Sequence, residues 1–225
     1  MAQLQEQSLG ELARTIPGAT AVFHNYRLDF CCGGDKMLRE AAQMRGVDPD
    51  EVVARLEDLL AAPPSAEHWE QASEAELIDH ILVRYHDPLR EQLPELQRLT
   101  RRVEKVHAAH PDCPAGLADV LAQMEEELEM HMRKEEEVLF PMLARRQHGA
   151  ASQPVRVMRD EHDAHGEVLE RIATLTNDMQ PPERACNTWQ ALYAGLALLR
   201  HDLMEHIHLE NNVLFRMGQT RAQPA

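Results

Sequence analysis

The sequence predicts an all-α protein: an up-down-up-down four-helix bundle, preceded by a small helical domain. Strong helix formers such as Ala, Leu, Glu, Arg and Gln dominate the 225 residues, and glycine is rare at 10. No segment shows the sustained alternation of Val, Ile and Thr that is typical of strands. Four long segments carry apolar residues three and four apart, and short connections between them favour antiparallel neighbours. The apolar seam of the second segment is expected to contain Leu121, Met124, Leu128, Val138 and Met142.

Three segments are expected along the chain: a small helical domain at 1–60, a linker at 61–73 and the bundle at 74–220. Pro63 and Pro64 mark the linker, because proline cannot continue a helix interior. A domain of about 60 residues is small for a core of its own. We therefore expect it to pack on the bundle or on a second subunit, and a homodimer is our prediction.

Residues that typically begin or end helices predict the helix boundaries. Ser8 begins the first short helix and Pro17-Gly18 ends it. The short helices are expected at about 8–16, 19–26, 34–46 and 49–60. A capping box, Ser73-Glu74-Ala75-Glu76, begins the first long helix, and Pro88 and Pro94 should kink it near His86. The long helices are expected at about 74–110, 115–148, 152–179 and 182–217.

The composition excludes several functional classes. A formal net charge of −15 argues against binding to nucleic acid or to an anionic membrane surface. No apolar run reaches the roughly 18 residues of a membrane span, and the N-terminus has no basic, apolar start typical of a signal peptide. Adjacent cysteines, Cys31 and Cys32, make a strained disulfide, so we expect a reducing, cytoplasmic location.

A phrase of the sequence occurs twice. Residues 131–140 read HMRKEEEVLF and residues 206–215 read HIHLENNVLF, each with His-x-x-x-Glu followed by Val-Leu-Phe. His86-Asp87 and His162-Asp163 precede these phrases, and each is followed by Glu and Leu at the same offsets. The chain therefore resembles a duplicated helical hairpin that supplies two histidines and one glutamate per copy.

The duplicated residues predict a metal site. A helical His and Glu four apart share one face, and here that face is the apolar seam. A buried unpaired carboxylate costs several kcal/mol, but it is tolerated when it coordinates a cation. Two such carboxylates at matching positions are hard to explain as ordinary core polar groups. The candidate metal ligands are His86, His131, Glu135, His162, His206 and Glu210.

Duplication predicts a dinuclear centre with approximate two-fold symmetry. We expect His86 with His131 on one metal and His162 with His206 on the other, with the two glutamates and a solvent-derived oxo group as bridges. Imidazole and carboxylate ligands with open positions favour two non-haem iron ions over structural zinc, with manganese as an alternative. His165 lies on the seam, but its counterpart in the first copy is Leu89, so we do not expect it to be a ligand.

Acidic and phenolic residues flank the ligand positions. Asp87, Asp163, Glu161 and Tyr85 are candidates to orient the ligands or relay protons. The alternative is that each is a solvated or interhelical polar residue.

A second chemical feature is Asp29-Phe30-Cys31-Cys32-Gly33-Gly34. The glycines allow a backbone turn that other residues resist, and a helix beginning just after them should lower the pKa of a thiol. The pair could therefore be reactive, bind a metal or carry electrons. The alternative is two small, buried apolar side chains.

These motifs together resemble the repair-of-iron-centres family of hemerythrin-like di-iron proteins, and the resemblance covers nearly the whole chain. It implies a cytoplasmic protein of nitrosative and oxidative stress that helps to restore damaged iron–sulfur clusters. The family's ligands fall on the six residues chosen from the repeat, and its cysteine pair falls on Cys31 and Cys32. Glu127 and Glu161 resemble the family's acidic residues near the metals.

Several functions follow from this resemblance. The leading expectation is a ferrous pair that binds nitric oxide and reduces it to nitrous oxide, an enzymatic activity in which the cysteines pass electrons. Donation of iron to damaged iron–sulfur proteins is an alternative in the same process. A reversible carrier or sensor of oxygen is a rival of another class, and a metal-free helical scaffold is a third.

Overall fold

The structure is a computed structural model that describes residues 2–16, 18–61, 69 and 72–220. Within these ranges it contains helices, turns and loops and no strand, which confirms the all-α prediction. None of the helices in the described part combines the length and apolar character needed to cross a membrane. Pro17 and most of the expected linker, including Pro63 and Pro64, lie outside the described residues.

The chain forms two compact units. The bundle unit comprises residues 79–203, and the N-terminal unit comprises residues 1–78 together with the C-terminal residues 204–225. The last bundle helix begins in the bundle unit and ends in the N-terminal unit.

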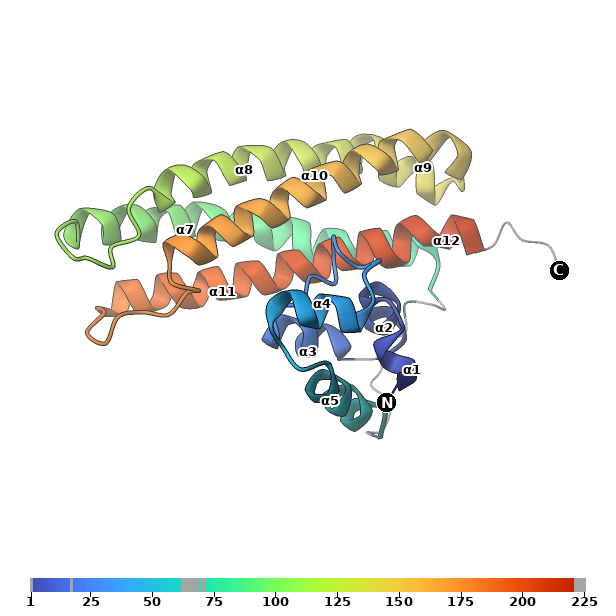
Figure 1. Ribbon diagram of the computed structural model, residues 1–225. Coiled ribbons are helices and arrows are strands. Elements are labelled where there is room, and N and C mark those ends of the chain that lie inside the picture. The colour runs from blue at the N-terminus through green and yellow to red at the C-terminus, as the bar shows by residue number, and fades with distance from the viewer. Residues whose placement is uncertain (1, 17, 62–68, 70–71, 221–225) are drawn as a thin grey trace. The chain divides into compact units, whose positions relative to one another are not determined.

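Four antiparallel helical rods make up the bundle unit, as predicted (Figure 1). Short turns connect the rods, so consecutive rods run in opposite directions. In chain order the rods are η2 (Leu82–His86) with α7 (Asp87–Val106), then α8 (Leu117–Lys134) with η3 (Glu135–Leu139) and α9 (Phe140–Ala144), then α10 (His148–Leu175), and α11 (Asn187–His208).

The predicted apolar seams form the core of the bundle unit, with one shift of register. Leu121, Met124 and Leu128 are buried as expected. Val138, also expected on the seam, is 50% exposed, and its neighbour Leu139 is buried instead. The cause is η3, a π-helical turn at 135–139 that adds one residue to the turn and moves the later seam positions forward by one.

Three π-helical turns lie at positions where the sequence places candidate ligands. The first, η2, ends at His86, where prolines predicted a kink. The second, η3, begins at Glu135, and the third, η4 (Leu209–Leu214), contains Glu210. Such turns are rare in helices and occur often at functional sites.

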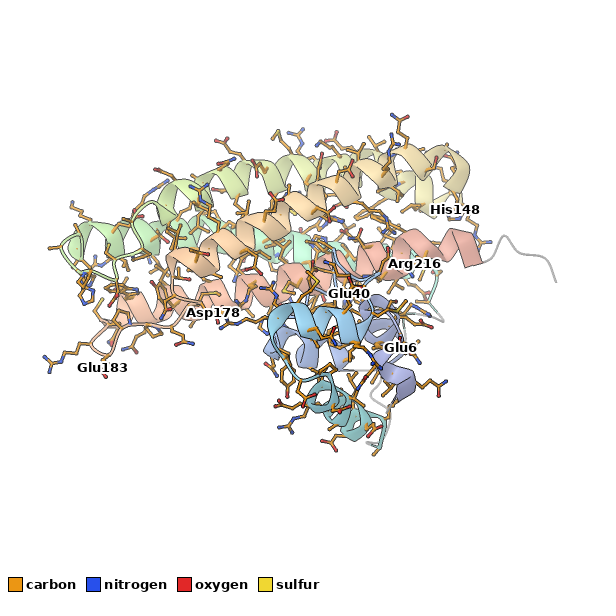
Figure 2. The ribbon with its side chains drawn as sticks, viewed as in Figure 1. Glu6, Glu40, His148, Asp178, Glu183 and Arg216 are labelled. Carbon is orange, nitrogen blue, oxygen red and sulfur yellow. The ribbon has the colours of Figure 1, made fainter. Side chains whose placement is uncertain are left out.

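The third and fourth rods are joined by a strained turn. Asn177, Asp178 and Met179 all have positive φ, which ends α10 at Leu175 rather than at the expected residue 179. Asp178, labelled in Figure 2, forms a 2.6 Å ion pair with Arg200 of α11, which ties this turn back to the bundle.

Short helices pack together in the N-terminal unit. They are α1 (Ala2–Gln5), α2 (Leu9–Thr15), α3 (Ala19–Asn25), α4 (Leu38–Arg45) and α5 (Pro49–Ala61), joined by η4 and by α12 (Phe215–Thr220). Ser8 caps α2 as predicted, accepting from the Glu11 amide. The predicted capping box at Ser73 and Glu76 begins α6 (Glu74–Ile81).

The core of the N-terminal unit includes part of the expected bundle segment, as the small size of residues 1–60 predicted. Its fully buried side chains include Leu9, Leu12, Phe23, Leu28, Phe30, Leu38 and Leu56. The helix η4, which belongs to the expected bundle segment 74–220, packs against α2 and adds apolar residues to this core. Residues 1–60 therefore pack on part of that segment, and the homodimer stays a prediction.

Candidate metal centre

Four of the six predicted ligands converge in the bundle unit, each from a different turn of the rods. His86 ends η2, His131 lies on α8, Glu135 begins η3 and His162 lies on α10. All four are at most 1% exposed. His131, Glu135 and His162 each offer a ligand atom within 4.8 Å of the others.

The distances among these groups are those of donors around a common point. His131 Nε2 lies 3.1 Å from His162 Nε2 and 3.4 Å from Glu135 Oε1. His86 Nε2 lies 3.5 Å from Glu135 Oε2. Both imidazole–carboxylate distances exceed the roughly 2.7–2.9 Å of a charge-assisted hydrogen bond. The carboxylate therefore faces two imidazoles without closing on either.

Two further carboxylates hold the outer nitrogens of these imidazoles. Glu136 Oε1 lies 2.7 Å from His86 Nδ1, and Glu161 Oε2 lies 2.8 Å from His131 Nδ1. A carboxylate can only accept, so each Nδ1 carries the proton and donates it. In the neutral ring, Nε2 then presents a lone pair toward Glu135. Lone pairs and a carboxylate that face one another repel unless a cation lies between them, so this donor set fits a metal ion.

Each outer carboxylate is paired in turn with a cation. Arg90 donates to both Glu136 and Glu129 at 2.9 Å, and Lys134 donates to Glu161 at 2.5 Å. The hydrogen bond from His131, and then the contact with Lys134, lower the pKa of Glu161 to about 2. Glu161 therefore stays ionised at neutral pH and can keep accepting from His131.

The remaining predicted ligands lie in the N-terminal unit. His206 and Glu210 stand one turn apart across the junction of α11 and η4, with 3.0 Å between His206 Nε2 and Glu210 Oε1. Both are buried, at 1% and 0% exposure. The expectation that both repeated glutamates are buried carboxylates is confirmed.

The residues expected to flank the ligands differ in their surroundings in the structure. Glu161 contacts His131, whereas Asp87 and Asp163 are exposed to solvent. Tyr85 is buried with its ring against His80, at 5.8 Å between centroids. Glu127 lies on α8, one turn before His131, where it accepts a hydrogen bond from Gln123.

Sequence reasoning missed Glu136, the outer partner of His86. The repeat gave no signal for it, because the matching residue in the second copy is Asn211. His165, which was not expected to be a ligand, is buried with its ring edge-on to that of His131 at 4.9 Å between centroids.

The cysteine pair occupies a tight loop in the N-terminal unit. Asp29 Oδ1 accepts from the Cys32 amide at 3.0 Å and from the Cys31 thiol at 3.4 Å, and the two sulfurs are 3.7 Å apart. Both are free thiols. The contact with Cys32, together with burial, raises the pKa of Cys31 well above its usual value.

That result corrects the expected lowering of a thiol pKa by a helix N-terminus. The helix α4 begins at Leu38, beyond the loop, so its N-terminus is several residues from either sulfur. The glycines also act differently from the expectation. A Cβ on Gly33 would lie 2.9 Å from Asp29 atoms, and one on Gly34 would lie 2.8 Å from the Phe30 carbonyl. Neither glycine has a positive φ, so close backbone approach requires them.

Comparison with known proteins places these features in families. Residues 77–218 match the hemerythrin HHE cation binding domain, which defines the helical bundle as a member of that class. Residues 5–60 match a domain of unknown function, DUF542, also called the ScdA N-terminal domain.

Relatives of nearly the same length share about half of the residues. The chain is 51% identical to the iron–sulfur cluster repair protein YtfE of Dickeya chrysanthemi and to that of Yersinia pseudotuberculosis, and 50% identical to that of Pectobacterium atrosepticum. Each alignment covers 94% of this chain and 96% of the relative. The chain belongs to the YtfE family of iron–sulfur cluster repair proteins.

Proposed function

We propose that this protein binds two non-haem iron ions and takes part in the repair of damaged iron–sulfur clusters. The observation that carries the proposal is the arrangement around Glu135: a buried carboxylate faces the Nε2 atoms of His86 and His131, whose Nδ1 protons are held by Glu136 and Glu161. Carboxylate-held imidazoles of this kind are typical of metal ligands. The relatives are named as iron–sulfur cluster repair proteins, which supports the repair function.

The six predicted ligands would form one centre, with Glu135 and Glu210 as bridges. The duplication supports this, because it gives each copy two histidines and one glutamate. The 3.1 Å contact between His131 and His162 favours these two on one metal, which leaves His86 with His206 on the other. This pairing differs from the one expected within each copy. An approximate two-fold axis permits both pairings, so symmetry alone could not choose between them.

The donor set supports iron. Imidazole and carboxylate ligands suit iron and manganese, whereas structural zinc sites are more often rich in thiolate. Bound ferrous iron would supply the binding position for nitric oxide and the electrons for its reduction to nitrous oxide. Around it the chain would exclude water and hold the ligand protons. Glu127, one turn before His131, is the candidate to deliver protons, whereas the ionised Glu161 orients His131 by accepting its Nδ1 proton.

The cysteine pair would serve the same process from its own unit. Two thiols 3.7 Å apart can carry a pair of electrons, or bind iron in transit to an acceptor protein. Iron donation is the alternative within this proposal. The clients would be damaged iron–sulfur proteins, and the reduced thiols suit a cytoplasmic location.

A reversible oxygen carrier or sensor is the second candidate, because the bundle matches the hemerythrin class. The two functions differ in turnover. A carrier binds oxygen and releases it unchanged, whereas the proposed enzyme consumes nitric oxide and forms nitrous oxide.

Iron content and nitric oxide turnover of anaerobically purified protein test the proposal. We expect two irons per chain, loss of iron in Glu135→Leu, and wild-type iron content in Glu137→Leu, whose side chain is 64% exposed. A single zinc, or no metal after iron-replete expression, would refute the di-iron centre. Reversible oxygen binding without nitric oxide consumption would favour the carrier. Sedimentation velocity would test the predicted homodimer.

A further inference from the structure

Two asparagines link the metal-ligand turn to the cysteine loop within the N-terminal unit. Asn211 and Asn212 directly follow Glu210 in η4, and each is 3% exposed. The Asn211 amide donates to the carbonyl of Cys31 at 3.3 Å. The Asn212 amide donates to the carbonyl of Phe30 at 3.2 Å. Residues adjacent to a predicted ligand therefore hold the backbone on which the thiols are carried.

Close packing makes this link tight. A Cβ on Gly34 would lie 3.0 Å from Asn212 Oδ1, and one on Gly10 would lie 2.6 Å from the same atom. Gly10 also donates its amide to the Gly34 carbonyl at 2.8 Å. Three segments thus meet at the Asn212 side chain: α2, the cysteine loop and η4. The glycines permit this approach, so the loop has little room to move independently of η4.

A ring contact joins the same two segments. The Asn212 amide donates to His208 Nδ1 at 3.1 Å, and the His208 ring packs edge-on against Phe30 with 5.6 Å between centroids. Phe30 directly precedes Cys31. A displacement of η4 would therefore be passed to the loop through hydrogen bonds and through apolar packing together.

The link is absent from the duplicated pattern. The positions that match Asn211 and Asn212 in the first copy are Glu136 and Glu137. Glu136 holds a ligand histidine, and Glu137 is exposed beside Arg133. The corresponding turn of the first copy therefore has no buried amide side chains at these positions. The buried amides of Asn211 and Asn212 in the second copy are thus expected to have a role other than metal binding.

We propose that Asn211 and Asn212 are positioning residues that couple metal binding at Glu210 to the reactivity of Cys31 and Cys32. The coupling rests on the proposed function, in which Glu210 is an iron ligand. When a metal draws Glu210 into its coordination geometry, the next two residues of the same turn shift the Phe30 and Cys31 carbonyls. Coupling between two sites is reciprocal, so modification of the thiols must change metal affinity by the same factor.

Thiol alkylation rates test the coupling. Iodoacetamide alkylation of Cys31 and Cys32, followed by peptide mass spectrometry, would be compared in metal-free protein and in protein loaded anaerobically with ferrous iron and desalted. Typical couplings between sites are about 5- to 150-fold, so iron should change the wild-type rate at least about fivefold. In the double variant Asn211→Ala/Asn212→Ala, iron should still bind, but the two rates should be equal.

Glu137→Ala is the matched control, because it alters the first-copy counterpart of Asn212, and it should behave as wild type. Asn211→Ala alone removes one hydrogen bond and should lose part of the coupling, which keeps the test available if the double variant does not fold. The metal-free proteins provide a separate comparison: the double variant should be alkylated faster than wild type, because its loop is no longer held.

The possible outcomes separate the two proposals. An iron effect that persists unchanged in the asparagine variants, or a wild-type rate that iron does not alter, would overturn the coupling while leaving the di-iron proposal intact. Wild-type protein that binds no iron would overturn both, and the iron analysis would identify that case directly. Direct capture of iron by the thiols would protect them equally in wild type and variant, and so counts against the coupling.

Discussion

Replacement of Glu135 by leucine should stabilise the metal-free protein but leave the protein less stable than wild type when iron is bound. In the metal-free protein the Glu135 carboxylate is fully buried and faces two imidazoles at 3.4 and 3.5 Å. A buried carboxylate that faces imidazole lone pairs costs several kcal/mol of folding free energy, and an apolar side chain of similar volume avoids that cost. We therefore expect metal-free Glu135→Leu to unfold at a higher temperature than metal-free wild type.

Iron should invert that order. A ligand that binds only the folded state at about 1,000 times its Kd adds about 4 kcal/mol to the free energy of unfolding. For a chain of this size, each kcal/mol raises Tm by about 2–4 °C, so iron should raise the wild-type Tm by about 8–16 °C. Glu135→Leu lacks a bridging ligand and should gain little, which leaves it the less stable protein in iron.

Thermal unfolding followed by circular dichroism, with and without ferrous iron under anaerobic conditions, measures both halves of the prediction. Glu137→Leu is the control, because its side chain is exposed two residues away, and it should follow wild type in both conditions. The reasoning is refuted if Glu135→Leu destabilises the metal-free protein and still gains the full stabilisation from iron. That result would make Glu135 a structural partner of protonated histidines.

Three further perturbations follow from individual contacts. Glu136→Gln should weaken iron binding about 10–100-fold in a chelator competition, as loss of an outer-sphere partner usually does, whereas Glu137→Gln should not. Gly34→Ala should lower the urea concentration at the midpoint of unfolding, because its Cβ would lie 2.8 Å from a backbone carbonyl. Gly149→Ala is the control: its Cβ would meet open space on a helix, so the free energy of unfolding should rise by up to about 1 kcal/mol. Burial lowers the pKa of His208 to about 4, so the unfolded chain takes up its proton first as pH falls through about 6.5. Between pH 7.5 and 5, this histidine should lower the free energy of unfolding of metal-free wild type by about 2 kcal/mol. His208→Gln should remove that loss. An equal dependence of stability on pH in both proteins would contradict the prediction.

The sequence predicted the architecture well, because long-range packing here follows from local periodicity. The seams on the rods, the Ser8 cap and the capping box at Ser73 were all visible as spacings between residues. The burial of Glu135 and Glu210 was predicted for the same reason, since both lie on apolar seams. The connections between the rods are short compared with the rods themselves, which favours antiparallel neighbours.

The errors came from features that periodicity does not encode. A π-helical turn keeps the composition of a helix while shifting its register, so Val138 was expected in the core in place of Leu139. The sequence did not predict that η4 is the element that completes the core of the N-terminal unit, because η4 lies some 150 residues or more further along the chain than the helices it joins. The raised pKa of Cys31 depends on burial and on the position of Asp29, neither of which follows from adjacent cysteines.

The outer contacts of the ligands show where the two copies have diverged. The inner residues are duplicated, since each copy keeps two histidines and one glutamate at matching offsets. The outer residues are not: Glu136 is matched by Asn211, and Glu161 is matched by Tyr85. In one copy the residue after the predicted bridging glutamate holds the imidazole of a predicted ligand, and in the other it holds the backbone of a cysteine. A site that only bound two metals would not need different outer residues in the two copies, because equivalent ligands could be oriented by equivalent hydrogen-bond partners. The divergence is instead expected of a centre whose two sides have different tasks, one retaining the metal and the other connecting it to the thiols.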